Sequence, residues 1–174
     1  MTGAQDTGDG RMNRLYVVAT WLPRRETIGV GALGSVTFAR GWYAYVGSAR
    51  RGRDARVARH MRATKPLRWH ADYVFTRRPA TRAWTLDTPL SECRLARLLT
   101  VADGGTPGPG GFGAGDCGCA GHLVRFDCRR SLAAAVRAIG PVRPCRAAGR
   151  LVSRSGPPRR AAAAREEVSG PCRP

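Results

Sequence analysis

The chain has 174 residues, about the length of one domain, and 43% of them are hydrophobic, which is enough to bury a core and excludes a wholly disordered chain. Lysines and arginines total 30 against 12 aspartates and glutamates, and the net charge of +18 excludes an ordinary near-neutral domain. No apolar stretch reaches the roughly 18 residues of a membrane span, and residues 1–10 lack the apolar core of a signal peptide. We therefore expect a cytoplasmic or nucleoid-associated protein with no membrane partner.

The first half of the chain predicts a leader, three strands and a helix. Residues 1–13 are expected to be a disordered leader, and Gly29 to Gly34 favours a turn. The helix is expected over residues 53–63, where Val57 and Met61 lie four positions apart. The expected strands, rich in β-branched and aromatic residues or closed by glycine and proline, cover residues 15–22, 35–38 and 41–48.

The second half predicts two further helices and two strands. Residues 69–76 fit either a helical or a strand period, and we favour a short helix. Thr88 is predicted to cap a helix that has Pro89 at its first position and runs to about Asp103. A glycine-rich loop is expected over residues 104–115. The expected strands cover residues 81–86 and, at an edge, residues 122–126. This order of elements predicts a small sheet with helices packed on it.

The predicted domain covers residues 14–127, and a basic tail follows it. Residues 128–174 carry a net charge of +9, half of the excess, and contain many prolines and glycines. We predict a mostly disordered tail with a short helix over residues 132–138. Such a tail attracts polyanions without reading their sequence, and an unselected tail filled by the codons of a GC-rich genome is the alternative.

One segment within the domain is strongly basic. Residues 50–68 contain eight basic side chains and one acid, Asp54, for a net charge of +7. Because the segment lacks the large aromatic side chains of an interfacial helix, we expect nucleic acid as its partner and not an anionic membrane. The residues expected to bind nucleic acid are Arg50, Arg51, Arg53, Arg59, Arg62, Lys65 and Arg68.

Glu92 is the most informative single residue. It lies on one helical stripe with Leu95, Leu99 and Ala102, which predicts an inward carboxylate. A buried carboxylate needs a cation, hydrogen bonds or an opening to solvent. The alternative is an ordinary first-turn glutamate that reaches water and is favoured by the helix dipole.

Arg56 and His60 are a second candidate pair, four residues apart on one helix face. A guanidinium can grip a phosphate with two hydrogen bonds, and an imidazole beside it can move a proton. Two surface side chains on a basic helix are the alternative. Tyr16 lies in the first strand, and Tyr43 and Tyr45 point to one face of a later strand, where packing is their usual role.

Cys117, Cys119 and His122 place three potential zinc ligands within six residues, and Cys93 or Cys128 is available as the fourth. A single residue between two cysteines is shorter than the usual spacing of two to four. The sequence therefore favours buried free thiols, with a zinc site as the alternative.

In chain order, Tyr16, Tyr45-Val46-Gly47, Arg56 with His60, and Glu92 resemble the motif pattern of GIY-YIG endonucleases. The resemblance is closer to their DUF123 branch, and it covers about residues 14–126. Its motifs resemble residues 41–48 (Gly-Trp-Tyr-Ala-Tyr-Val-Gly-Ser), 69–73 (Trp-His-Ala-Asp-Tyr), 92–93 (Glu-Cys), 111–113 (Gly-Phe-Gly) and 116–123 (Asp-Cys-Gly-Cys-Ala-Gly-His-Leu). The first tripeptide, residues 15–17, departs from the pattern by lacking Gly-Ile, and no asparagine follows Glu92.

The resemblance implies an α/β (α+β) fold with a small mixed, mainly antiparallel sheet flanked by helices. It also implies hydrolysis of phosphodiester bonds in DNA, with RNA left open as a substrate. Glu92 would hold Mg²⁺ or Mn²⁺, Arg56 would stabilise charge on the phosphate, and Tyr16 or Tyr45 would position or deprotonate water, assisted by His60. His70 is a candidate of the branch's own site. The alternative is a non-catalytic nucleic-acid-binding module with a vestigial nuclease site.

Overall fold

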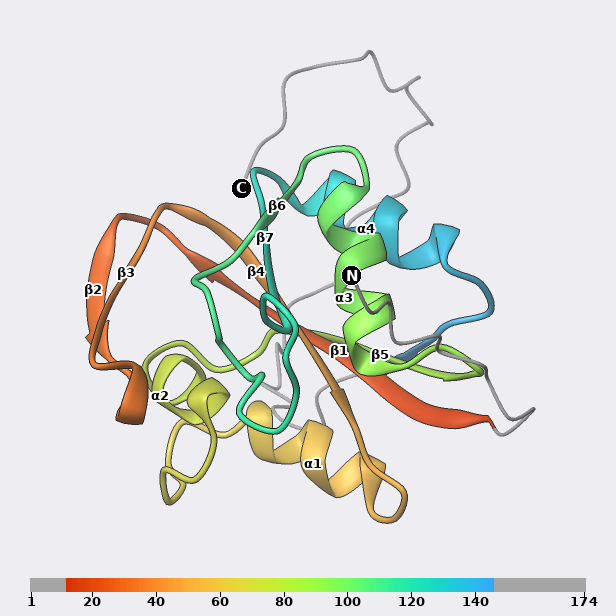
Figure 1. Cartoon of the computed structure of the whole chain (residues 1–174), viewed down its shortest axis with the longest axis horizontal. Helices are drawn as coiled ribbons and strands as arrows, with labels where there is room; N and C mark the ends of the chain where they lie inside the picture. Colours follow the sequence, from red (N-terminus) through yellow and green to blue (C-terminus); the bar gives the residue numbers. More distant parts are fainter. Residues whose placement is uncertain (1–11, 146–174) are drawn as a thin grey trace, which may run out of the picture.

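A six-stranded antiparallel sheet runs through the computed structural model, which describes residues 12–145 (Figure 1). The strand order is β6-β7-β4-β1-β5-β8. The strands are β1 (Asn13–Leu22), β4 (Gly41–Ser48), β5 (Arg82–Thr88), β6 (Gly105–Pro107), β7 (Leu123–Phe126) and β8 (Arg143–Cys145). The predicted fold class, a mainly antiparallel sheet flanked by helices, is confirmed.

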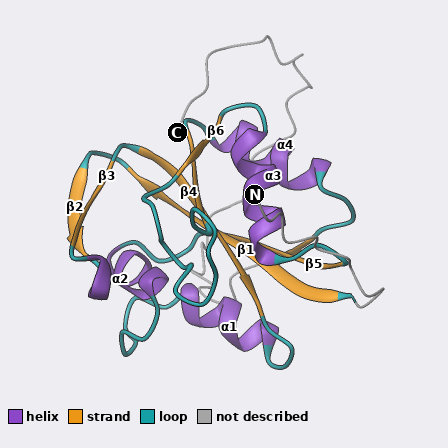
Figure 2. Cartoon of the chain, in the orientation of Figure 1, coloured by secondary structure: helices purple, strands orange, loops and turns teal. Residues whose placement is uncertain are grey.

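A separate two-stranded ribbon consists of β2 (Glu26–Gly29) and β3 (Ser35–Phe38) (Figure 2). β3 matches the predicted strand at both ends. β2 is missing from the prediction because only Ile28 in it is both apolar and buried, which leaves no hydrophobic pattern to detect. The predicted turn between the two strands contains a short 3-10 helix (Gly31–Leu33).

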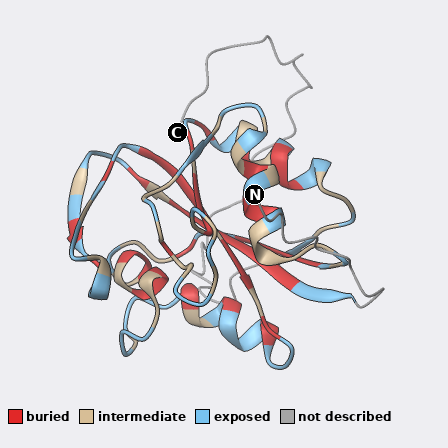
Figure 3. Ribbon diagram, in the orientation of Figure 1, coloured by how far each residue is buried: buried red, intermediate tan, exposed pale blue. Residues whose placement is uncertain are grey.

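Helices cover both faces of the sheet. Their buried apolar side chains pack against the inward residues of the strands, and Figure 3 shows the buried positions following the sheet and the inner sides of the helices. One face packs against α3 (Glu92–Val101) and α4 (Arg129–Ala138). The other face packs against α1 (Arg53–His60), α2 (His70–Arg77) and the ribbon.

The central strand β1 contributes to both hydrophobic layers. Leu15, Val17 and Ala19 pack on the side of α3 and α4, whereas Tyr16 and Val18 pack on the side of α1 and α2. This alternation follows from the two-residue period of a strand. Since both faces are buried, β1 reads in the sequence as a continuous apolar run, which is why the sequence predicts it well.

The predicted start of α3 is wrong. Thr88 ends β5, where it pairs with Asn13, and its hydroxyl accepts a hydrogen bond from the backbone N–H of Leu90 at 3.3 Å. The N-cap is Ser91, whose Oγ accepts from the N–H of Arg94 at 3.2 Å. Thr88 and Ser91 both carry hydroxyls that can cap a helix. Because Thr88 pairs with a neighbouring strand, Ser91 is the residue that caps α3.

The end of α1, the glycine-rich loop and the place of β7 in the sheet also differ from the prediction. α1 ends at His60 instead of residue 63, because the His60 carbonyl accepts from the N–H of Ala80 at 3.1 Å and leaves the helical pattern. The predicted glycine-rich loop contains the short strand β6. β7 is therefore not an edge strand, since β6 pairs with its outer side.

Folded structure continues past residue 127, where the sequence analysis places the start of the basic tail. α4 contains the predicted helix over residues 132–138, and β8 pairs with β5. β1 begins at Asn13, within the predicted leader. The rest of the predicted leader and tail, residues 1–11 and 146–174, lie outside the described residues. Between residues 12 and 145, no helix combines the length and apolar character required to cross a bilayer.

Candidate functional site

A cleft of about 330 Å³ gathers five of the six predicted catalytic residues. The predicted catalytic candidates among its lining residues are Tyr16, Tyr45, Arg56, His70 and Glu92. They come from β1, β4, α1, α2 and α3, so elements far apart in the chain converge there. The sixth candidate, His60, is fully buried behind the cleft.

Ser48, the last residue of β4, joins Arg56 to Glu92. Its carbonyl accepts a hydrogen bond from Arg56 Nη1 at 2.9 Å, and its hydroxyl and backbone N–H contact the carboxylate of Glu92. Leu95 and Leu99 are fully buried on the same face of α3, as the periodicity predicts, while the Glu92 side chain is 27% exposed. Glu92 therefore occupies the end of an apolar stripe, where that stripe opens to the cleft.

The surroundings of Glu92 favour its charged form. Burial acts to raise the pKa of Glu92, but the contacts with His122 and Ser48 outweigh burial and hold the pKa below its usual range. Its Oε2 lies 3.2 Å from Nδ1 of His122. A carboxylate held in this way is ionised at neutral pH and able to attract a cation.

Tyr16 and Tyr45 project from the paired strands β1 and β4 into the same layer. Burial is the main cause that raises the pKa of both phenols, so both are protonated at neutral pH. Tyr16 Oη lies 3.2 Å from Nε2 of His60, and burial lowers the pKa of His60 to about 4. His60 is thus a neutral imidazole that supports Tyr16 from behind.

Gly47 has no side chain, and the ring of Tyr16 occupies the space where a Cβ would lie. It is the partner of Tyr16 across β1 and β4, and a Cβ on Gly47 would lie 2.4 Å from Tyr16 Oη. We expect Gly47→Ala to lower the free energy of unfolding by about 2 kcal/mol, because the rigid buried ring has to move. Urea denaturation measures the effect, and Gly29→Ala, whose Cβ would meet nothing within 4 Å, is the control. Equal stability of both variants would contradict the prediction.

His70 helps to hold the loop that closes the cleft. Its Nδ1 accepts a hydrogen bond from the backbone N–H of Gly113 at 3.1 Å. Gly113 has a φ of 76°, and a Cβ there would lie 2.7 Å from the ring of Tyr45. The glycine is therefore required by both backbone conformation and close approach.

Three of the residues predicted to bind nucleic acid make contacts within the fold. Arg53 is buried and pairs with Asp87 at 2.6 Å, and Arg59 pairs with the buried Asp72 at 2.8 Å. Lys65 donates to two backbone carbonyls at and beyond the end of α1. Arg53 and Arg59 thus neutralise carboxylates, and Lys65 supplies a donor to carbonyls at the end of α1. The exposed members of the predicted set are Arg50, Arg51, Arg62 and Arg68.

Three side chains that line the cleft, those of Ser48, Trp69 and Asp116, are not among the predicted site residues. Ser48 gives no signal of its own, because its role depends on Arg56 and Glu92 lying on either side of it. Trp69 lies under Arg56, with the guanidinium carbon 5.3 Å from the ring centre. Asp116 offers a second carboxylate, and its position next to Cys117 in the resemblance motif was the available signal.

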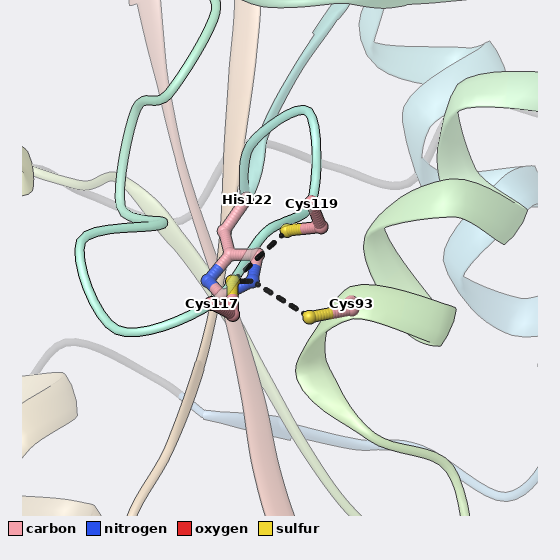
Figure 4. A group of neighbouring side chains, drawn as sticks. All are labelled: Cys93, Cys117, Cys119 and His122. Carbon is pink, nitrogen blue, oxygen red and sulfur yellow. Dashed lines mark hydrogen bonds between the residues drawn. The ribbon is translucent and has the colours of Figure 1, made fainter. Parts of the chain in front are cut away.

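A cluster of three cysteines and one histidine lies next to the cleft (Figure 4). Cys93 comes from the first turn of α3, and Cys117, Cys119 and His122 come from the segment that precedes β7. Their ligand atoms all lie within 4.8 Å of one another, so the four side chains can hold a metal ion. Cys93, and not Cys128, therefore completes the set.

The surroundings of Cys93 disfavour its thiolate form. Burial, with the neighbouring thiols of Cys119 and Cys117, raises the pKa of Cys93 to about 12.

A larger pocket of about 810 Å³ borders Cys93 and Cys119 and also contains Arg94 and Arg97. Among residues 12–145, no carboxylate or histidine lines that pocket.

Comparison with known proteins gives one match. Residues 15–142 match the family model described as a domain of unknown function, DUF123. Searches of curated proteins and of solved structures found no match.

Proposed function

Because the chain belongs to the DUF123 family, and because its cleft gathers the residues described above, we propose that it is a metal-dependent endonuclease of the GIY-YIG type. The proposed reaction is hydrolysis of a phosphodiester bond in DNA. The observation that carries the proposal is the pairing of Arg56 and Glu92 through Ser48 beside two tyrosines. These are the groups needed to hold a phosphate, a divalent cation and a water molecule.

Glu92 and Asp116 are the residues that would hold Mg²⁺ or Mn²⁺. Both line the cleft, and carboxylate oxygens are the ligands that these hard cations prefer. Such an ion supplies a Lewis acid and lowers the pKa of water. The contacts of Ser48 and His122 fix Glu92 as a carboxylate, so the site carries the charge that a divalent cation requires.

Arg56 would bind the scissile phosphate and stabilise the negative charge that develops on it. Tyr16 and Tyr45 are protonated, so they would orient the attacking water by hydrogen bonds and would not remove its proton. His60 would fix the orientation of the Tyr16 hydroxyl. The exposed arginines before and after α1 would bind the flanking phosphates of the DNA backbone. Their positions are Arg50, Arg51, Arg62 and Arg68.

The test is cleavage of end-labelled duplex DNA by the purified protein at low salt. We expect strand breaks with Mg²⁺ or Mn²⁺ and none after EDTA is added, because the bare carboxylates cannot activate water. Duplex, single-stranded and branched DNA and an RNA of equal length identify the substrate. Absence of cleavage of every substrate with both cations would contradict the proposal.

The exposed arginines also fit a second function, a nucleic-acid-binding module that does not cut. The absence of any asparagine after Glu92 favours this alternative, since the GIY-YIG nucleases that the chain resembles often carry one. This module would bind DNA with an affinity that falls steeply as salt rises. It would show no cleavage with either cation, and Glu92→Gln would leave binding unchanged.

A further inference from the structure

We propose that Cys93, Cys117, Cys119 and His122 bind one zinc ion, and that this ion positions Glu92 in the cleft through His122. The zinc site stands on its own geometry. The positioning of Glu92 rests on the proposed nuclease function, because it concerns the cation that Glu92 would hold.

The spacing of the donor atoms suits a tetrahedral ion. Cys93 Sγ lies 3.4 Å from His122 Nε2, Cys117 Sγ lies 3.5 Å from the same nitrogen, and the sulfurs of Cys117 and Cys119 are 3.1 Å apart. Zinc bonds of about 2.3 Å to sulfur and about 2.0 Å to nitrogen at tetrahedral angles place a sulfur about 3.5 Å from the nitrogen and two sulfurs about 3.8 Å apart. Both distances to His122 therefore fit, and the sulfurs of Cys117 and Cys119 would move about 0.7 Å apart around the ion. Three sulfurs and one imidazole nitrogen are a structural zinc set, whereas Mg²⁺ requires oxygen ligands.

The fold supplies a reason for an ion at this place. Residues 108–122, between β6 and β7, contain no helix or strand, and a loop of this length is uncommon without its own stabilising element. Its backbone turns sharply at Gly111, Gly113 and Gly121, which all have positive φ. A metal ion would join this loop to the first turn of α3 through Cys93, and so fix the wall of the cleft that contains Gly113 and Asp116.

His122 connects the cluster to the cleft. Its Nε2 faces the sulfurs, and its Nδ1 lies 3.2 Å from Oε2 of Glu92. The residue is 2% exposed, and its Nδ1 is a buried atom without a hydrogen-bond partner among residues 12–145. When a metal ion binds Nε2, the proton of the neutral ring is on Nδ1, where it can be donated to the carboxylate. Glu92 would then be fixed by His122 on one side and by Ser48 on the other.

Zinc content tests the first half of the inference. We expect about one zinc ion per chain in protein purified without chelator, measured by mass spectrometry of the metal. Cys119→Ser should lose most of this zinc, and the matched control Cys145→Ser, which replaces a free cysteine outside the cluster, should keep it. Replacement by Co²⁺ should give the visible absorption of tetrahedral thiolate coordination. Substoichiometric zinc together with freely reactive thiols would overturn the site.

The positioning of Glu92 through His122 is tested with the variant His122→Cys. This variant retains four zinc ligands but removes the imidazole beside Glu92. We expect full zinc content and an unchanged circular dichroism spectrum. The affinity of the cleft for Mn²⁺, measured by electron paramagnetic resonance, should fall by about 10- to 100-fold, the usual effect of losing an outer-shell partner. If His122→Cys does not fold, zinc removal from the wild type by a chelator should lower Mn²⁺ affinity by a similar factor.

The outcomes separate the inference from the proposed function. Wild-type Mn²⁺ affinity in a zinc-loaded His122→Cys protein, or in chelated wild type if that variant does not fold, would overturn the positioning of Glu92 and leave the nuclease proposal standing. A wild type that holds zinc but binds no Mn²⁺ and cuts no DNA would overturn the nuclease proposal and the positioning with it. The zinc site would remain in that case, because its content is measured independently.

Discussion

DNA cleavage by the Arg56→Ala variant is expected to be about a hundred- to a thousand-fold slower than cleavage by the wild type. The guanidinium is held in the cleft by the carbonyl of Ser48 and by the ring of Trp69, so it is already oriented for a phosphate. A donor fixed before the reaction stabilises the transition state more than it stabilises bound DNA. We therefore expect the loss in kcat, with a much smaller change in DNA affinity.

Single-turnover cleavage with Mg²⁺, combined with a filter-binding measurement of affinity, separates these two effects. Arg62→Ala is the matched control, because Arg62 is an exposed arginine of the same basic segment and is not among the residues that line the cleft. It should weaken binding modestly and leave kcat unchanged. Equal losses of kcat in both variants would show that the segment acts only through its total charge.

The Asp72→Asn variant is expected to be less stable than the wild type by about 3 kcal/mol. Asp72 is fully buried, and its Oδ2 accepts from Arg59 at 2.8 Å and from the N–H groups of Arg68 and Trp69 at 2.9 and 3.0 Å. Its Oδ1 has no hydrogen-bond partner among residues 12–145. An asparagine therefore loses the ion pair with Arg59 and buries an amide N–H₂ group in place of a carboxylate oxygen.

The contacts of Asp72 also predict how its contribution to the free energy of unfolding depends on pH. Burial acts to raise the pKa of Asp72, but the hydrogen bonds from Arg59 and the two backbone N–H groups outweigh it and lower the pKa. A carboxyl group with a depressed folded pKa contributes its full stability above its unfolded pKa of about 4 and loses it as pH falls through the folded value. The difference in unfolding free energy between wild type and Asp72→Asn should therefore narrow below about pH 4.

Urea denaturation at pH 7, and at steps down to pH 3, measures both effects. Asp54→Asn is the control, because Asp54 is an exposed carboxylate in the first turn of α1, and it should change stability by less than about 0.5 kcal/mol. A difference between wild type and Asp72→Asn that stays constant with pH would mean that the ion pair with Arg59 does not carry the stability.

The parts of the fold that the sequence predicts are those where local pattern and burial agree. β4 and β3 match their predicted limits because alternation or glycine marks both ends. The inward position of Glu92 follows from the helical stripe it shares with Leu95 and Leu99, and the start of α3 could be wrong by several residues without changing it. The N-cap itself was missed because Thr88 and Ser91 are both good capping residues, and only strand pairing decides between them.

Other parts of the site depend on contacts between distant segments, and no local pattern reveals them. Arg53 looks like any other arginine of its segment, yet it is buried because Asp87 and two strand carbonyls face it. The choice of Cys93 over Cys128 as the fourth member of the cluster likewise depends on how α3 packs beside β7. The sequence therefore predicts which residue types are available for the site, and three-dimensional packing selects among them.

The two outer strands of the six-stranded sheet restrict how this protein can meet other chains. β6 and β8 each have three residues, and each contains a proline, Pro107 and Pro144, which has no N–H group to donate. Short borders interrupted by proline are poor templates for the addition of a foreign strand. Within residues 12–145, neither border of this sheet thus favours self-association by strand addition.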